Sequence, residues 1–266
     1  MVSHPQNKDG SPRWHAIPGH EFSGTVAELG SKVREFAAGD AVFGMNNWFL
    51  DGATAEFCVA AASSVARKPH GLSFEQAAAV AIGALTAWQG LVDRADLRAG
   101  ERLLVQGAAG AVGVFAVQLG AQMGAEVIAT ASARHREFVT ELGVRQFLDY
   151  ASEPFDQQVR DLDVIFDTVG GDTLRRSWLL LKPGGRVVTI ASDSEGNGSD
   201  PRIKDAFFIV EPNSQQLADI GNRLDAGTLF VFVDAKVPLE EASAAYARHV
   251  RRAHGYGKVV VTVPCV

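Results

Sequence analysis

Cysteine is scarce in this 266-residue sequence, which has only Cys58 and Cys265, and this scarcity excludes a fold held together by a disulfide framework. No apolar run reaches the roughly 18 to 20 residues that a membrane-spanning helix needs, and the polar first residues lack the apolar core of a secretory signal. The net charge of −6 offers no general attraction for nucleic acid or for an anionic membrane. We therefore expect a cytoplasmic protein that acts on small molecules.

The chain shows three regions of different pattern. Up to about residue 82, apolar and polar residues alternate in short segments separated by glycines, which predicts β-strands within 21–30, 39–44 and 54–61. From about residue 101, strands alternate with helices, as is typical of a parallel sheet covered on both faces. The strands expected there are 102–106, 126–131, 146–150, 163–169 and 185–191, and the helices are 111–123, 134–142 and 172–181.

The last region begins near residue 212. Its pattern predicts helices at 214–227 and 240–250 and strands at 228–233 and 257–263, and the final strand is expected to return to the first region. Between the second and third regions, residues 193–204 look like a flexible surface loop. Earlier in the chain, Ser73, followed by Glu75 and Gln76, is expected to cap a helix that enters 77–91.

Three glycines stand between the strand at 102–106 and the helix that follows it. Gly107 suits a sharp turn, Gly110 lets a backbone approach a ligand, and Gly113 lets the helix pack closely on the strand. Exposed amides at such a helix start, aided by the helix dipole, bind a pyrophosphate. Because a strand, a helix and a second strand surround the motif, it predicts a dinucleotide site of the Rossmann type and not merely a tight turn.

The end of the second strand selects the cofactor. An NAD site usually places an acid about 20 residues after the loop, where this chain has Ser132 and Arg134 and no carboxylate. A serine hydroxyl can hydrogen-bond an extra phosphate, and Arg134, with Arg136 as a second cation, can pair with it. The plainer alternative is that these arginines form a solvated helix start. The pattern favours NADP(H).

With these residues in view, the chain resembles the medium-chain dehydrogenase/reductase superfamily, in its zinc-independent quinone oxidoreductase and enoyl reductase branch. The matching stretches include IPGHEFSGTVAELG, GLSFEQAAAVAIGALTAWQGL, ERLLVQGAAGAVGVFAVQLG and DVIFDTVGGDTL. The resemblance implies an α/β fold in which a Rossmann domain at 83–211 is inserted into a GroES-like barrel domain formed by 1–82 and 212–266. It also implies further barrel strands ahead of residue 17, which this sequence lacks, so we expect an open sheet edge.

The resemblance also assigns the cofactor contacts. Beyond the loop glycines and the phosphate-binding side chains, the positions that it implies are Thr86, Ala111, Val112, Tyr150, Thr168, Val169, Ile190, Ala191, Phe207, Phe208 and Lys258. The alternative for two of these aromatics, Tyr150 and Phe208, is that they are ordinary core residues. Likewise, Thr86 could be only a helix hydroxyl that bonds within its own helix.

Zinc is not expected, although the Gly-His-Glu stretch at His20 and Glu21 resembles a metal-ligand segment of zinc-dependent relatives. Catalytic zinc needs three protein ligands, and no cysteine precedes Cys58. The stretch ahead of Thr86, where relatives place another ligand, contains none, and the four-cysteine lobe is absent. We therefore expect His20 to be a hydrogen-bonding residue.

Two functions remain open from the sequence. The first is an NADPH-dependent enzyme that reduces a quinone or an activated C=C bond next to a carbonyl, with Thr86 as the catalytic hydroxyl and with Trp48 and Phe49 lining the substrate pocket. The second is a family member that binds NADP(H) without redox activity. A homodimer could form if the strand at 228–233 pairs with its copy.

Overall fold

The computed structural model describes residues 16–191 and 201–264. The described chain divides into two compact units, one containing the residues up to Leu85 together with those from Glu211 onward, the other running from Thr86 to Val210. None of the helices in the described part of the chain has the length and apolar character needed to cross a lipid bilayer.

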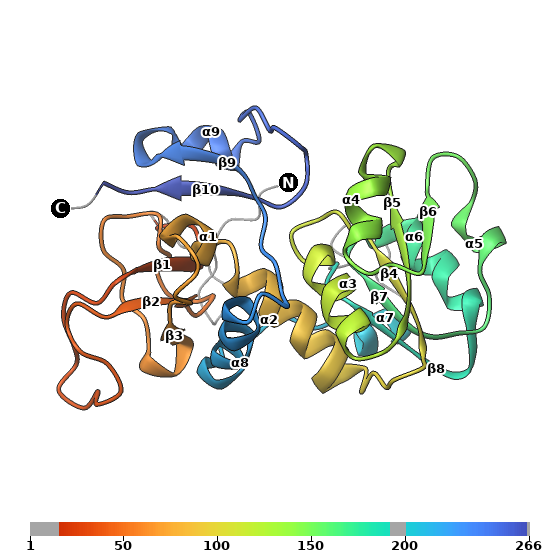
Figure 1. Ribbon diagram of the computed structural model, residues 1–266, viewed down its shortest axis with the longest axis horizontal. Helices are drawn as coiled ribbons and strands as arrows, with labels where there is room; N and C mark the ends of the chain where they lie inside the picture. Colours follow the sequence, from red (N-terminus) through yellow and green to blue (C-terminus); the bar gives the residue numbers. More distant parts are fainter. Residues whose placement is uncertain (1–15, 192–200, 265–266) are drawn as a thin grey trace. The chain divides into compact units, whose positions relative to one another are not determined.

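The second unit contains a five-stranded parallel sheet in the order β6-β5-β4-β7-β8 (Figure 1). The strands are β4 (Arg102–Gln106), β5 (Glu126–Ala131), β6 (Gln146–Asp149), β7 (Leu162–Asp167) and β8 (Leu181–Thr189). The chain starts at β4, adds β5 and β6 on one side, and then crosses to add β7 and β8 on the other. This reversal beside β4 is the point at which open α/β sheets bind ligands.

Helices accompany this sheet, as Figure 1 shows. They are α3 (Gly113–Gln122), α4 (Arg136–Glu141), α5 (Phe155–Gln158), α6 (Gly171–Ser177) and α7 (Pro201–Ala206), and a π-helical turn at Gln89–Arg94 precedes β4. All six residues of β7 are buried, as expected for a strand covered on both faces. The expected strands and helices of this region are therefore confirmed, with shifts at their ends.

The first unit has two small sheets. Strands β1 (Glu21–Thr25), β2 (Ala41–Met45) and β3 (Val65–Arg67) are antiparallel in that order, while β9 (Val233–Pro238) and β10 (Lys258–Thr262) pair in parallel. Its helices are α1 (Phe74–Ala78), most of α2 (Ala81–Trp88), α8 (Ser214–Asp225) and α9 (Ala242–Tyr246). An ion pair of 2.7 Å between Glu75 and Lys236 joins α1 to β9, so both ends of the chain build this unit.

The helix cap at Ser73 is confirmed. Its hydroxyl accepts a hydrogen bond from the Gln76 amide at 3.2 Å, and the Gln76 side chain accepts one from the Ser73 amide at 2.9 Å. This capping box satisfies two amides that a helix start would otherwise leave without acceptors. The helix begins at Phe74, three residues earlier than the apolar run at 77–91 indicates.

Three sequence expectations are wrong. The segment 54–61 is not a strand: residues 55–60 form no backbone–backbone hydrogen bond within the described chain, and Phe57 and Val59 are 66% and 84% exposed. The segment 228–232 is not a strand either, because the amides of Thr228 and Leu229 bond back to the Arg223 carbonyl and finish the end of α8. Residues 201–204 belong to α7 and not to a loop, while 193–200 lie outside the described residues.

Candidate cofactor site

The loop between β4 and α3 has two glycines at which any other residue would force neighbouring atoms to move. Gly107 has φ +76°, and a Cβ there would lie 2.3 Å from Thr168 Oγ1. At Gly113, a Cβ would lie 2.2 Å from the Gly107 carbonyl oxygen. Gly110 is exposed, and its Cβ would meet only that same oxygen, at 3.1 Å. The first and third glycines thus hold the turn against the sheet, while the middle one leaves its surface open.

The start of α3 presents unpaired backbone amides. No side chain caps the helix at Val112, and the amides of Ala111, Val112 and Gly113 have no acceptor among the described residues. The flanking amides are engaged, since Gly110 bonds the Gly107 carbonyl at 2.9 Å and Val114 bonds the Gly110 carbonyl at 3.1 Å. Three free N–H groups at the positive end of a ten-residue helix form an anion-binding site suited to a pyrophosphate.

A second group of polar side chains follows β5. Ser132 lies directly after the strand, with its hydroxyl oxygen 3.3 Å from His135 Nδ1. The exposed Arg134 side chain has no ion pair or hydrogen bond with any described residue. By contrast, the Arg136 guanidinium lies over the Phe147 ring at 4.4 Å. Both arginine side chains are exposed, and Arg134 is the one without a ring contact or an ion pair among the described residues.

Tyr150 adjoins this group from the neighbouring strand. Its amide donates to the Ala131 carbonyl at 3.4 Å, and its side chain is 61% exposed. The alternative that Tyr150 is a core aromatic is therefore wrong. Phe208 differs: it is buried, and the Arg94 guanidinium lies over its ring at 5.6 Å, so it packs as a core aromatic does.

The remaining predicted contacts of this unit gather where β7 and β8 end. The Thr168 hydroxyl donates to the Gln106 carbonyl at 2.7 Å, which sets the turn after β7 against the glycine loop. Val169 in the same turn is 53% exposed. After β8, Ile190 and Ala191 are partly buried, and the half-buried Phe207 forms a β-bridge with Thr189. The structure thus brings the loop and these turns to one edge of the sheet.

Sequence reasoning missed Asp167, the last residue of β7. It is fully buried, and its carboxylate accepts hydrogen bonds from the amides of Val169 and Gly170 and from the Thr189 hydroxyl. Burial raises the pKa of this carboxyl above its ordinary value, and the hydrogen bonds partly oppose that rise. The one feature of the sequence that could have identified Asp167 is that it is an acidic residue at the end of an apolar strand.

Three predicted residues lie in the first unit. The Lys258 ammonium forms an ion pair with the Glu21 carboxylate, which also accepts from the Ile82 amide at 3.0 Å. The His20 ring lies 5.0 Å from the ring of Trp48, and Phe49 is 45% exposed. In the part of the chain that the structure describes, no three His, Cys, Asp or Glu side chains are grouped as a metal site. The Glu21 carboxylate is thus engaged by both Lys258 and the Ile82 amide.

Thr86 lies within α2 and is almost fully buried. Its hydroxyl is the group that sequence reasoning selected for catalysis. The burial of Thr86 gives that hydroxyl a dry surrounding, in which a hydrogen bond is stronger than in water.

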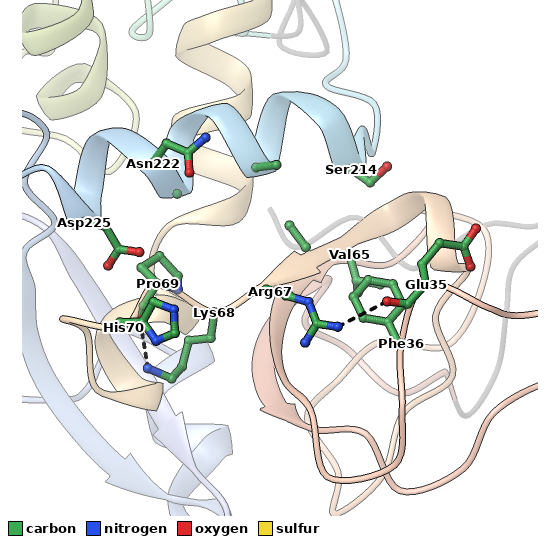
Figure 2. Close-up of a pocket in the computed structure, with 13 residues that line it drawn as sticks. Glu35, Phe36, Val65, Arg67, Lys68, Pro69, His70, Ser214, Asn222 and Asp225 are labelled. Carbon is green, nitrogen blue, oxygen red and sulfur yellow. Dashed lines mark hydrogen bonds between the residues drawn. The ribbon is translucent and has the colours of Figure 1, made fainter.

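A separate cavity of about 430 Å³ lies in the first unit, between β3 and α8 (Figure 2). Its two prominent cations are already engaged. Arg67 pairs with Asp40 at 2.9 Å and donates to the Glu35 carbonyl, and Lys68 donates to the Pro69 carbonyl at 2.8 Å. Cations occupied in this way make a poor phosphate site, unlike Arg134 in the second unit.

A glycine turn with free helix-start amides, at the reversal point of a parallel sheet, defines a dinucleotide-binding protein of the Rossmann type. Family models agree with this class: residues 3–88 match the alcohol dehydrogenase GroES-like domain, and residues 142–261 match a family described as zinc-binding dehydrogenase.

Known proteins are similar over nearly the whole chain. The quinone oxidoreductase structure from Coxiella burnetii is 31% identical, with a TM-score of 0.85 over 97% of this chain and 81% of that one. The CurK enoyl reductase structure is 27% identical, with a TM-score of 0.83 over 97% and 82%. The spectinabilin polyketide synthase system protein NorB of Streptomyces orinoci is 36% identical over 92% of this chain, which spans 12% of that protein.

The chain belongs to the medium-chain dehydrogenase/reductase superfamily, in its zinc-independent quinone oxidoreductase and enoyl reductase branch. This is a family of oxidoreductases that bind a nicotinamide cofactor. The α/β architecture, a Rossmann-type parallel sheet together with a GroES-like domain, is confirmed.

Proposed function

We propose that this chain is an NADPH-dependent oxidoreductase that reduces a quinone, or a C=C bond conjugated to a carbonyl, by hydride transfer and without zinc. One observation carries the cofactor assignment. Three free amides at the start of α3 are followed, at the end of β5, by a serine and an unpaired arginine with no carboxylate. The substrate class is supported by the quinone oxidoreductase and enoyl reductase names of two similar structures.

The residues present fit the cofactor in two places. The amides of Ala111, Val112 and Gly113 would hold the pyrophosphate, and the Cβ of any other residue at position 113 would displace the turn that presents them. Ser132 and Arg134 would hold the 2′-phosphate, because a hydroxyl and a guanidinium together satisfy a dianion that an acid would repel.

NADPH supplies the hydride when it is bound, and the chain supplies orientation and electrostatics. The Thr86 hydroxyl, a backbone amide or a water stabilises the oxygen that becomes negative as the hydride adds. Trp48 and Phe49 supply apolar surface for a flat substrate. Solvent would supply the proton, to the α-carbon of a conjugated C=C substrate or to the oxygen of a quinone, so the reaction would need no buried acid.

The zinc-free assignment is supported by the side chains around His20. Its neighbour Glu21 is bonded to Lys258 and to the Ile82 amide, and the described residues hold no group of three ligands. Metal analysis of the purified protein is expected to find no stoichiometric zinc. Activity that chelation abolishes and zinc restores would overturn this assignment.

The decisive experiment follows the loss of NADPH absorbance with a quinone and, separately, with an enone. We expect turnover with NADPH that greatly exceeds turnover with NADH. The Arg134→Ala variant serves as the matched control, since it should lose the preference for NADPH and keep the fold. Tight NADPH binding without turnover across a broad panel of carbonyl substrates would instead indicate a non-redox NADP(H)-binding protein.

A further inference from the structure

Two aspartates of β7 are buried at opposite ends of the same strand, and their surroundings differ. Asp163, near the start of the strand, pairs with Lys182 and accepts from the Arg102 amide at 2.9 Å. Despite its burial, the pKa of Asp163 is lowered by these partners. Asp167, at the end of the strand, forms no ion pair with any described cation. Among the described residues, its carboxylate is stabilised by two amides and a hydroxyl.

The hydrogen bonds of Asp167 connect two turns that are distant in the sequence. On one side, Oδ1 accepts from the amides of Val169 at 3.2 Å and Gly170 at 3.1 Å, and Oδ2 also accepts from Gly170 at 3.0 Å. On the other side, Oδ2 accepts from the Thr189 hydroxyl at 2.7 Å. Thr189 Oγ1 in turn accepts from the Ala191 amide at 3.1 Å. One carboxylate therefore fixes the turn after β7 and the turn after β8 relative to each other.

These two turns pack closely against each other, and the first also packs against the glycine loop. A Cβ at Gly170, which has φ +75°, would lie 2.5 Å from the Ala191 Cβ, so the turns are in direct contact. A Cβ at Gly107 would lie 2.3 Å from Thr168 Oγ1, so the first turn also abuts the glycine loop. A change in either turn would be transmitted to the other and to the loop that presents the free amides.

We propose that Asp167 is a positioning residue for the nicotinamide cofactor: its buried carboxylate holds Thr168, Val169, Ile190 and Ala191 in the arrangement that the cofactor requires. The proposal rests on the proposed cofactor site and adds a residue that touches no ligand itself. A fold-stabilising role alone does not require this carboxylate, because a buried carboxylate without a counter-charge opposes folding even when it is hydrogen-bonded. This loss of folding free energy is explained if the Asp167 carboxylate holds the cofactor-binding residues in place.

The test compares Asp167→Asn and Thr189→Val with Asp163→Asn as the matched control. Asparagine keeps the shape of the side chain, but its Nδ2 can only donate. The charge-assisted bond from the Thr189 hydroxyl is therefore lost, and at most a neutral bond of reversed direction replaces it. Removing that hydroxyl in Thr189→Val breaks the same link from the other side. We expect both variants to weaken NADPH binding in calorimetry by about tenfold, because segments that the link no longer holds must be ordered when the cofactor binds. The KM for NADPH should rise while kcat stays within about threefold.

A second measurement uses the cofactor-free protein. Amide hydrogen exchange at Gly170 and Ala191 should accelerate in Asp167→Asn and Thr189→Val and stay unchanged in Asp163→Asn. Asp163→Asn should lower the Tm while leaving the NADPH dissociation constant within about twofold of wild type. This combination separates positioning from general stability.

The possible outcomes are distinct. Wild-type NADPH affinity in both Asp167→Asn and Thr189→Val would overturn the inference and leave the proposed function intact. An equal loss of affinity in Asp163→Asn would also overturn it, since it would mean that any weakening of β7 has this effect. Failure of the wild-type protein to bind NADPH would overturn the proposed function and this inference with it.

Discussion

Replacing Gly113 by alanine is the sharpest perturbation of the phosphate loop. The new Cβ would lie 2.2 Å from the Gly107 carbonyl oxygen and 2.8 Å from the Ala108 Cα, both of which are backbone atoms. Contacts under 3.0 Å are essentially never observed for a Cβ, so the turn must move by at least about 0.8 Å. Because the obstructing atoms are backbone, no side-chain rotation can relieve the overlap.

The magnitude follows from what that movement does to stability and to binding. Overpacking of this kind costs about 1–3 kcal/mol, of which the better helix propensity of alanine returns up to about 1 kcal/mol. Stability should therefore fall only modestly. A displacement of about 0.8 Å moves a phosphate hydrogen bond of about 2.9 Å beyond its useful range. Losing one or two charge-assisted bonds of about 1.5–3 kcal/mol each weakens NADPH binding at least about tenfold.

The assay is calorimetric titration of Gly113→Ala with NADPH, together with its denaturant-unfolding curve. Gly120→Ala is the matched control: it overpacks the same helix, with its Cβ 2.6 Å from Leu103 Cδ2, but it meets no atom of the loop. We expect Gly120→Ala to lose stability without losing affinity. If Gly113→Ala binds NADPH within twofold of wild type, the loop does not carry the pyrophosphate and the reasoning fails.

Three other predictions concern charge. Ser132→Glu should shift preference toward NADH, because a carboxylate repels the 2′-phosphate and can bond ribose hydroxyls; an unchanged ratio of the two dissociation constants would contradict the placement. Arg134→Ala should weaken NADPH by about 10- to 100-fold and leave NADH within about twofold, whereas equal losses would indicate structural damage. Lys236 and Ser73 lower the pKa of Glu75 from 4.5 to about 2, so its pairing stabilises the fold above about pH 4.5 and is lost as the pH falls toward 2. Glu75→Gln should therefore reduce the free energy of unfolding by about 0.2–1 kcal/mol at neutral pH and by much less near pH 2, where about half of the Glu75 side chains are protonated. Urea titrations at both pH values measure this, and an equal loss at both would show that the charge is not the cause.

Much of the second unit could be predicted because its signals are local. A parallel strand buried on both faces is a short apolar run, and glycine stops such as Gly124 and Gly143, both with positive φ, mark where helices end. The expected strand at 126–131 has the same bounds in the structure. The loop glycines and the absence of an acid at the end of this strand can likewise be read from consecutive residues. The structure then provided the distances between them and their neighbours.

The errors fall where a strand depends on a partner. Residues 54–61 alternate as a strand should, yet a strand exists only when another chain segment accepts and donates its hydrogen bonds, and 55–60 have no such neighbour among the described residues. Thr228 and Leu229 have strand-forming side chains, but their amides donate to the Arg223 carbonyl at the end of α8. Pairing of this segment with its copy in a homodimer stays a prediction.

From the sequence alone, the Rossmann class could be predicted, and the pyrophosphate site and the preference for NADP(H) could be proposed, because each follows from residues within one turn or one strand end. Tertiary structure decided which of those residues are available. It left Arg134 free while placing Arg136 over Phe147, and it tied Lys258 to Glu21 across the length of the chain. It also made Asp167 a link between turns more than twenty residues apart, which only the packing of neighbouring parallel strands could bring together.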